Sequence, residues 1–137
     1  MKKIVIVDDD PGIRKLVDAT LGNKEYQIFQ AESGEKAIKI TRAEKPDLII
    51  MDIMMPGGMD GFEATRIIKS DPETKNCAIV ILSGTGQDAE KEKELAADVK
   101  DYFTKPFSPL ELIKKVEEVL GQEDFHGNKK PADRICG

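Results

Sequence analysis

The sequence predicts an α/β protein in which helices cover both faces of a parallel β-sheet. Short runs of almost purely apolar, β-branched residues recur along the chain, and such runs are typical of strands buried on both faces. Helical patterns separate these runs, so that strand and helix alternate five times over about 120 residues. With 137 residues, of which 39% are hydrophobic, the chain suits one domain with its own core.

Five segments are predicted to form the strands. Four of them show no polar alternation, and these are residues 4–7, 48–51, 78–82 and, more weakly, 102–103. Residues 26–29 alternate between apolar and polar side chains, which is the pattern of a strand with one solvated face. We therefore expect this strand at or near an edge of the sheet.

Each predicted helix begins at a residue that can cap its first turn. The first three caps are Asp10, Ser33 and Asp60, and the matching stop signals are Gly22, Lys45–Pro46 and Asp71–Pro72. A fourth helix, over residues 87–97, is rich in lysine and glutamate and is expected to be mostly solvated. The fifth begins at Ser108–Pro109 and is predicted to end at Gly121. Residues 1–121 then form the folded domain, and residues 122–137 form a polar, disordered tail.

Composition and charge exclude several classes of function. Acidic residues outnumber basic ones by 26 to 21, and the net charge of -5 argues against direct binding to nucleic acid. The chain has one histidine, no tryptophan and two cysteines without metal-type spacing, so a histidine-based triad, a base-stacking surface and a zinc site are not expected. Without an apolar run near ~20 residues or a signal peptide, we expect a cytoplasmic protein that does not bind membranes.

Reactive polar residues fall where the predicted strands end. Asp8 and Asp9 follow the first strand and Asp52 follows the third, while Ser83 and Lys105 follow the fourth and fifth. The carboxyl ends of parallel strands share one edge of an open sheet, and ligands bind at that edge. We therefore expect these five side chains to converge.

Such a cluster has a specific chemistry. Three neighbouring carboxylates repel one another unless a cation lies among them, and Mg²⁺ suits carboxylate oxygens together with a phosphate oxygen. An ammonium and a hydroxyl group beside Mg²⁺ would complete a seat for a phosphoryl group. Because the chain offers no histidine, cysteine or base-activated serine there, the acceptor would be a carboxylate, and the product an acyl phosphate.

Each of these residues also has a simpler structural explanation when taken alone. An aspartate after a strand is usually a helix cap, and we interpret Asp10 in this way. Ser83 alone would be a turn former, and Lys105–Pro106 would only punctuate the chain. Their joint position at four strand ends favours a functional cluster.

Taken in order, these residues resemble the receiver domain of two-component response regulators. The resemblance covers residues 2–121 and rests on residues 4–10 (IVIVDDD), residues 52–56 (DIMMP), residues 59–61 (MDG), Ser83 and residues 105–107 (KPF). It implies a flavodoxin-like fold, in which a five-stranded parallel sheet of order 2-1-3-4-5 lies between two layers formed by five helices.

The resemblance also implies a role for each residue of the site. Asp52 would accept the phosphoryl group. The Mg²⁺ ligands would be Asp8, Asp9, Asp52 and the main-chain carbonyl of Met54, with Mn²⁺ as a substitute metal. Lys105 would pair with the phosphate and Ser83 would move toward it, while Tyr102 stands where the family has an aromatic switch residue. The residues that tune dephosphorylation would be Met54, Gly84 and Thr85.

The function implied is a signalling switch rather than an enzyme, since the domain would catalyse only its own phosphotransfer and autodephosphorylation. The phosphoryl donor would be a sensor histidine kinase or a histidine phosphotransfer protein, selected by the first helix through Ile13, Arg14, Leu16, Val17 and Asp18. Phosphorylation would change binding to a downstream protein through the face formed by the fourth helix, fifth strand and fifth helix. We expect a monomer or a phosphorylation-dependent dimer.

The chain departs from the usual pattern of the family at three points. The turn over residues 56–61 has one more glycine than is usual, and Asp98 stands where glycine is common. The positions that steer the attacking water hold Met54 and Thr85, neither of which is a carboxylate or an amide. We therefore predict a phosphorylated state that is long-lived for its class, although Gly84 leaves the phosphate accessible.

Three other interpretations fit parts of the sequence. Residues 84–89 (GTGQDA) fit a dinucleotide-binding pattern, but Lys105 stands where an acidic residue would be needed after the next strand. A haloacid dehalogenase-type phosphatase would use Asp8 and Asp10, yet Gly12 replaces the usual Thr or Val, and no later acidic pair follows Lys105. The chain could also be a receiver fragment of a larger regulator or hybrid kinase, but the short segment after the fifth helix favours a stand-alone regulator.

Overall fold

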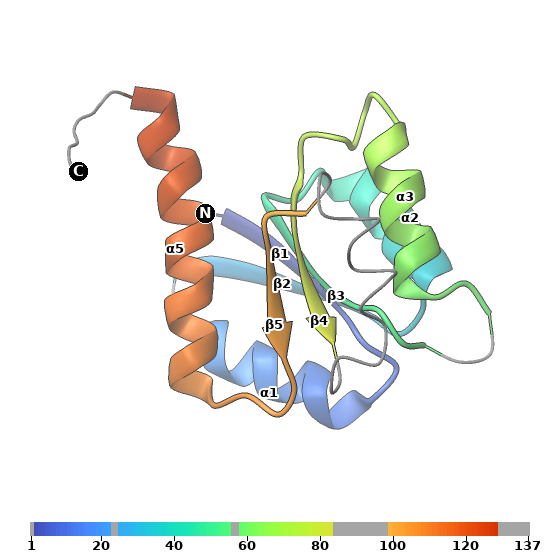
Figure 1. The fold of residues 1–137 in the computed structure, drawn as a ribbon, viewed down its shortest axis with the longest axis horizontal. Helices are drawn as coiled ribbons and strands as arrows, with labels where there is room; N and C mark the ends of the chain where they lie inside the picture. The colour runs from blue at the N-terminus through green and yellow to red at the C-terminus, as the bar shows by residue number, and fades with distance from the viewer. Residues whose placement is uncertain (1, 23–24, 56–57, 84–98, 129–137) are drawn as a thin grey trace.

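The computed structural model describes residues 2–22, 25–55, 58–83 and 99–128, the side chains of residues 122–128 excepted. These residues form three layers, with helices on both faces of a five-stranded sheet (Figure 1). All neighbouring strands are parallel, and their order is β2-β1-β3-β4-β5. The predicted flavodoxin-like fold is therefore confirmed.

The five strands lie close to the predicted segments. They are β1 (Lys2–Val7), β2 (Tyr26–Ala31), β3 (Leu48–Asp52), β4 (Ala78–Ser83) and β5 (Asp101–Thr104). The edge position of β2 is confirmed, and most of its residues are only half-buried, whereas every residue of β3 is buried. The register pairs Val7 with Met51 and Ser83 with Thr104, so the carboxyl ends of the strands lie side by side.

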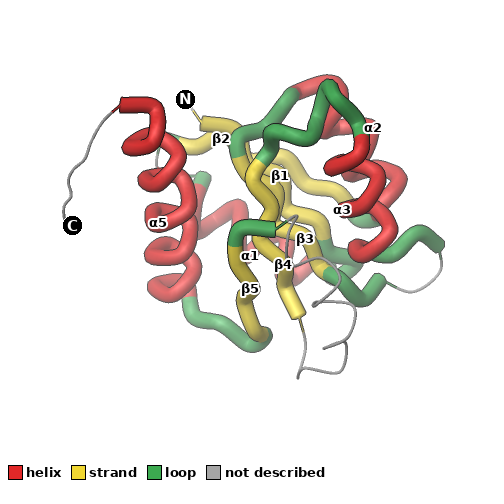
Figure 2. The backbone as a smooth tube through the Cα atoms, turned by 45° about the horizontal axis from the view of Figure 1, so that its top comes forward, coloured by secondary structure: helices red, strands yellow, loops and turns green. Residues whose placement is uncertain are grey.

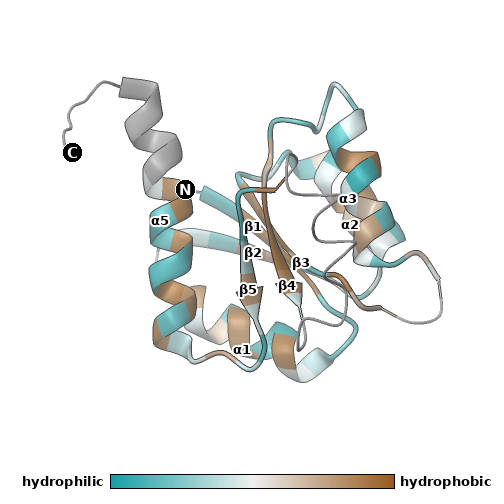
Figure 3. Ribbon diagram, in the orientation of Figure 1, coloured by the Kyte–Doolittle hydropathy of each residue, from teal (hydrophilic) through white to brown (hydrophobic). Residues whose placement is uncertain are grey.

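The helices of the described residues cover both faces of the sheet (Figures 1 and 2). The helices α1 (Pro11–Leu21) and α5 (Pro109–Asn128) pack on one face, and α2 (Gly34–Glu44) and α3 (Gly61–Ser70) pack on the other. The predicted helix over residues 87–97 lies outside the described residues. Figure 3 shows apolar residues concentrated in the central strands β3 and β4, while the helices carry both apolar and polar residues.

The two-sided burial explains why the strands are continuously apolar. In β1, Ile4 and Ile6 join the core under α1 and α5, while Val5 and Val7 join the core under α2 and α3. All four side chains are fully buried, and each burial contributes about 1.5–3 kcal/mol relative to exposure. A polar side chain at any of these positions would be buried away from water, whichever face of the sheet it lay on.

The predicted helix caps are confirmed by their hydrogen bonds. The carboxylate of Asp10 accepts from the amide of Gly12 at 2.8 Å, and that of Asp60 accepts from the amide of Glu63 at 2.9 Å. At the start of α5, Ser108 and Glu111 cap each other, with the Ser108 hydroxyl accepting at 3.1 Å and the Glu111 carboxylate at 2.9 Å. These caps set where each helix leaves the site edge of the sheet.

The predicted end of the fifth helix at Gly121 is wrong. The helix continues to Asn128, so residues 122–128, which we expected in a disordered tail, are helical. A glycine within a helix costs only about 1 kcal/mol relative to alanine, and the glutamine and acids that follow it are compatible with helix. The domain boundary at residue 121 stays a prediction, and residues 129–137 lie outside the described part of the chain.

Among the described helices, none combines the length and the apolar character that a membrane span requires.

Candidate functional site

The carboxyl edge of the sheet brings together the carboxylates that the sequence singled out. Asp8 follows β1 directly, and Asp52 is the last residue of β3. One carboxylate oxygen each from Asp8, Asp9 and Asp52 can be chosen so that all three lie within 4.8 Å of one another. Asp8 and Asp52 are buried, whereas Asp9 is exposed and closes the cluster toward solvent.

The ammonium of Lys105 lies against the same cluster. Its Nζ is 2.8 Å from Oδ2 of Asp8 and 3.3 Å from Oδ2 of Asp52. Burial lowers the pKa of Lys105, but the two carboxylates outweigh burial and raise the pKa above its ordinary value. Lys105 therefore carries a full positive charge at neutral pH, fixed between two strand ends.

Asp52 is the carboxyl group whose protonation is most altered by its surroundings. Its residue is 3% exposed, and its Oδ1 accepts a hydrogen bond from the amide of Met54 at 3.1 Å. Burial and the negative charge of Asp8 raise the pKa of Asp52 to about 6, against the opposing effect of Lys105. Asp52 is thus mostly ionised at neutral pH, but at a cost in free energy that a second cation would relieve.

The donor set fits a hard divalent cation. Oδ2 of Asp8 is buried, and the described residues offer it the Lys105 ammonium at 2.8 Å but no further donor. Its Oδ1 accepts from the amide of Asp10 at 3.0 Å, which holds the carboxylate in place. Oxygen ligands in this number and of this charge are those that Mg²⁺ and Mn²⁺ prefer.

The remaining predicted residues lie around this cluster in different degrees. Ser83 ends β4 and is buried, and its carbonyl accepts a hydrogen bond from the amide of Lys105 at 2.9 Å. Lys105 is joined to Pro106 by a cis peptide bond. Met54 is 48% exposed beside Asp52. Tyr102 is half-buried against the core under α2 and α3. Gly84 and Thr85, predicted to tune dephosphorylation, lie outside the described residues.

Gly61 supports the site in a way that the sequence analysis did not predict. Gly61, the first residue of α3, lies so close to the backbone of residues 52 and 53 that an added Cβ would overlap the carbonyl oxygen of Asp52. The close approach lets α3 begin directly against the segment that follows β3. The adjacent Asp60 cap was visible in the sequence, but a close backbone approach leaves no pattern there.

The substitution Gly61→Ala is expected to destabilise the protein by roughly 1–3 kcal/mol, because the methyl group forces the backbone after Asp52 to move. Urea unfolding measures the change. The matched control is Gly121→Ala, where an added Cβ meets nothing within 4 Å and stability should rise by up to about 1 kcal/mol. Equal stability of Gly61→Ala and the unaltered chain would contradict the close approach.

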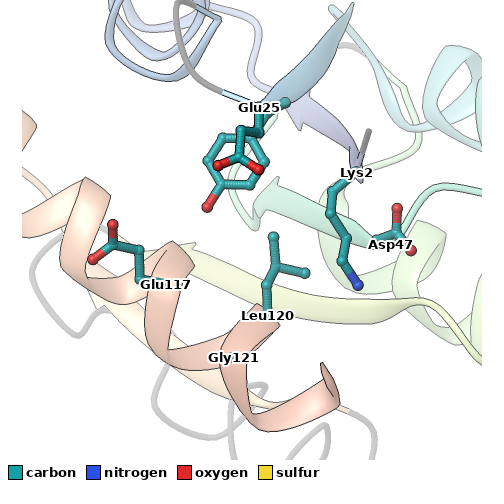
Figure 4. Close-up of a pocket in the computed structure, with 7 residues that line it drawn as sticks. Lys2, Glu25, Asp47, Glu117, Leu120 and Gly121 are labelled. Carbon is teal, nitrogen blue, oxygen red and sulfur yellow. The ribbon is translucent and has the colours of Figure 1, made fainter. Parts of the chain in front are cut away.

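The opposite edge of the sheet carries a pocket that is separate from this cluster. It has a volume of about 520 Å³ and is lined by residues at the amino ends of the strands and by α5, namely Lys2, Glu25, Tyr26, Asp47, Glu117, Leu120 and Gly121 (Figure 4). The carboxylate of Asp47 is engaged by the amide of Lys3 at 2.8 Å. The clustered carboxylates and Lys105 lie instead at the carboxyl edge, where parallel sheets bind ligands.

The structure also bears on a rival interpretation of the site. Asp10, which a haloacid dehalogenase-type phosphatase would use as a second catalytic acid, is exposed and accepts from the amide of Gly12 as a helix cap. The glycine pattern of residues 84–89 lies outside the described residues. The geometry thus favours Asp52, and not Asp10, as the partner of Asp8.

The fold and the site together define an α/β domain with a parallel sheet of order 2-1-3-4-5 that carries an acidic cluster and a lysine at its carboxyl edge. The chain matches the family model of the response regulator receiver domain over residues 4–117 and belongs to this family. It is therefore a receiver domain of the two-component response regulator type.

Individual relatives agree with this assignment. The chain is 37% identical to Protein PilH of Pseudomonas aeruginosa over 120 residues, covering 88% of this chain and 98% of PilH. Among solved structures, chemotaxis protein CheY4 of Vibrio cholerae matches with a TM-score of 0.79 and 32% identity, over 87% of this chain and 98% of that one. The chain spans about half the length of other curated relatives, such as the transcriptional regulatory protein PhoB of Pseudomonas aeruginosa, of which it covers 52%.

A further solved structure concerns the metal. The receiver domain of sensor histidine kinase PA1611 from Pseudomonas aeruginosa matches with a TM-score of 0.78 and 28% identity, over 88% of this chain and 98% of that one. That structure is described as having a magnesium ion coordinated in its active site cleft.

Proposed function

We propose that this domain is a switch in which Asp52 accepts a phosphoryl group from a phosphohistidine of a sensor histidine kinase or a histidine phosphotransfer protein. The observation that carries the proposal is the convergence of the Asp8, Asp9 and Asp52 carboxylates with the Lys105 ammonium at one sheet edge. Receiver domains are regulatory proteins rather than conventional enzymes, so the chemistry is limited to the domain's own phosphorylation and dephosphorylation.

The chemical step is a displacement at phosphorus. A lone pair of an Asp52 carboxylate oxygen forms the new O–P bond, the P–N bond breaks, and its electron pair leaves with the imidazole of the donor. Asp52 does this as the carboxylate, which a pKa of about 6 makes the major form at neutral pH. Bound Mg²⁺, or Mn²⁺ in its place, would neutralise charge on the phosphoryl oxygens.

The residues around Asp52 divide the remaining work. The carboxylates of Asp8 and Asp9, with Asp52 and the carbonyl of Met54, would hold the metal, which agrees with the magnesium described for the PA1611 receiver domain. Lys105 pairs with a phosphoryl oxygen, since its Nζ already lies 3.3 Å from Oδ2 of Asp52. Ser83, buried at the end of the neighbouring strand, moves toward the phosphoryl group.

The conformational response would pass through β5. Once Lys105 and Ser83 engage the phosphoryl group, the new dianion biases a pre-existing equilibrium between two arrangements. Tyr102 changes its packing, and its amide donates to Asp101 at 2.7 Å, whose carboxylate is also 2.6 Å from Lys115 of α5. The fourth helix, β5 and α5 then form the face that binds a downstream protein; the fourth helix lies outside the described residues.

The kinase-facing surface needs one correction. We expected Ile13, Arg14, Leu16, Val17 and Asp18 of α1 to select the donor, but Val17 is fully buried under the sheet. In an amphipathic helix, residues three or four positions apart share the inward face, and Val17 lies on that face of α1 together with Leu21. The other four are half-buried and remain the proposed donor surface.

Direct phosphorylation tests the proposal. The full chain is incubated with acetyl phosphate and Mg²⁺, and its mass is measured. We expect the addition of one phosphoryl group, no addition when a chelator is present from the start, and no addition to Asp52→Ala. Normal incorporation by Asp52→Ala would overturn the assignment of the acceptor.

The phosphorylated domain is predicted to be long-lived for its class, because Met54 and Thr85 offer neither a carboxylate nor an amide to orient a water molecule. After the phosphoryl donor is removed, the mass of the phosphorylated chain is followed over time. Decay over minutes or longer is expected, and Met54→Glu should shorten it. Decay of the unaltered chain within seconds would contradict the prediction.

A further inference from the structure

The backbone carbonyl of Asp8 accepts a hydrogen bond from an arginine side chain rather than from a neighbouring strand. The amide of Asp8 donates to the carbonyl of Ala31, the last residue of β2, at 3.1 Å. Because β2 ends there, the next polar group of the chain, the Asp8 carbonyl, has no continuing strand to bind it. Nη1 of Arg14, one turn into α1, donates to this carbonyl at 2.6 Å. A buried carbonyl at a strand end requires such a partner.

Arg14 holds the metal-binding segment from both sides. Its own amide donates to the carbonyl of Asp10 at 3.2 Å, while its guanidinium donates to the carbonyl of Asp8. The segment between these two carbonyls contains Asp9, and the side chains of Asp8 and Asp9 supply two of the three clustered carboxylates. The conformation of this segment decides whether these carboxylates meet Asp52, and the Arg14 guanidinium is a side-chain contact that holds its first carbonyl.

The guanidinium is itself oriented by a second contact. Nε of Arg14 donates to Oε1 of Gln30 at 3.3 Å, and Nε2 of Gln30 donates to Oδ2 of Asp18 at 2.9 Å. Gln30 lies on the edge strand β2, so this chain of hydrogen bonds joins the strand, α1 and the metal-binding segment. A planar guanidinium can serve both acceptors at once, which the ammonium of a lysine cannot do with the same rigidity.

We propose that Arg14 is a positioning residue for the divalent-cation site and that Gln30 orients it. This inference rests on the proposed function, because it needs a cation held by Asp8, Asp9 and Asp52. Arg14 does not contact the cation. It fixes the Asp8 carbonyl, and so determines where the neighbouring carboxylates stand before the cation arrives. Loss of a residue that orients metal ligands typically weakens metal binding about 10–100-fold.

The test is the affinity for Mg²⁺ of four variants, measured by calorimetric titration of the full chain. Arg14→Met, which keeps the aliphatic stem but removes every donor, is expected to weaken Mg²⁺ binding at least tenfold. Arg14→Lys should bind with an intermediate affinity. The matched control is Arg42→Met, which should bind Mg²⁺ normally. It removes an exposed arginine of α2 that pairs with Asp71 at 3.2 Å. Asp9→Asn should lose binding as a direct ligand.

A second readout separates positioning from a purely structural role. The rate of labelling by acetyl phosphate is measured against Mg²⁺ concentration. Arg14→Met is expected to need at least tenfold more Mg²⁺ for half-saturation but to approach the unaltered maximal rate. If Arg14→Met folds poorly, Gln30→Met keeps the arginine and should show a smaller shift in the same direction. An unchanged half-saturation value for Gln30→Met would overturn its orienting role.

The outcomes distinguish this inference from the proposed function. Unaltered Mg²⁺ affinity in Arg14→Met, together with lost affinity in Asp9→Asn, overturns the role of Arg14 and leaves the metal site in place. Absence of Mg²⁺ binding by the unaltered chain overturns both. Weakened binding in Arg14→Met with normal binding in Arg42→Met supports the inference.

Discussion

Replacing Lys105 by methionine is expected to slow phosphoryl incorporation from acetyl phosphate by about 100-fold or more. The ammonium lies against both Asp8 and Asp52, and a fixed positive charge at a transferring phosphoryl group is worth about two to three orders of magnitude in rate. The rate is measured at saturating Mg²⁺ by following the mass of the chain. Methionine keeps the length of the side chain, so packing changes little.

The same substitution has an opposite effect on metal binding. Lys105 neutralises the carboxylates in the metal-free protein, so its removal should tighten Mg²⁺ binding even as it slows the reaction. The control is Lys3→Met, which removes a half-exposed ion pair of 3.1 Å with Glu44 at the other edge of the sheet and should change neither quantity. Unaltered labelling by Lys105→Met would contradict the role given to this residue.

Replacing Asp52 by asparagine is expected to stabilise the metal-free protein near neutral pH by roughly 1–3 kcal/mol. Burial and the charge of Asp8 raise the pKa of Asp52 from 3.8 to about 6. A raised pKa means that the folded state holds the proton more tightly than the unfolded state. The stability that protonated Asp52 contributes is therefore complete below about pH 4 and is lost as the pH rises through about 6. Asparagine removes this loss.

The measurement is thermal unfolding with and without the substitution, across pH and without divalent cations. The Tm of Asp52→Asn should exceed that of the unaltered chain by roughly 5–10 °C at about pH 7, and the difference should shrink toward pH 4. Asp71→Asn is the control, and its Tm at about pH 7 should fall rather than rise. The amide of Glu73 and the Arg42 guanidinium lower the pKa of Asp71, so its ionised form favours the folded state. A lower Tm for Asp52→Asn at pH 7 would contradict the conclusion that ionised Asp52 destabilises the metal-free protein.

Much of the fold could be predicted because its signals are local. The apolar runs, the caps at Asp10, Asp60 and Ser108, and the alternation in β2 each report a preference of a few neighbouring residues. The convergence of the carboxylates followed from one further rule, that parallel strands end at the same edge. The family's pattern then ordered the strands and matched the observed topology.

The rest depends on contacts that leave no local signal. Arg14 reads as an ordinary polar residue of an amphipathic helix, and only the end of β2 at Ala31 explains why its guanidinium meets the Asp8 carbonyl. Val17 was assigned to the donor-binding surface, but the packing of α1 against the sheet buries it. Gly121 resembled a helix stop, yet a glycine stops a helix only where the following residues leave it, and here they continue.

Asp52, and not Asp8, is proposed to carry the phosphoryl group. Acyl phosphates are reduced by borohydride, which converts a phosphorylated aspartate into homoserine at the modified position. The full chain is labelled with acetyl phosphate and Mg²⁺, reduced, digested and sequenced by mass spectrometry. We predict homoserine at position 52, in an amount that depends on Mg²⁺. Homoserine at position 8, or at neither position, would contradict the account.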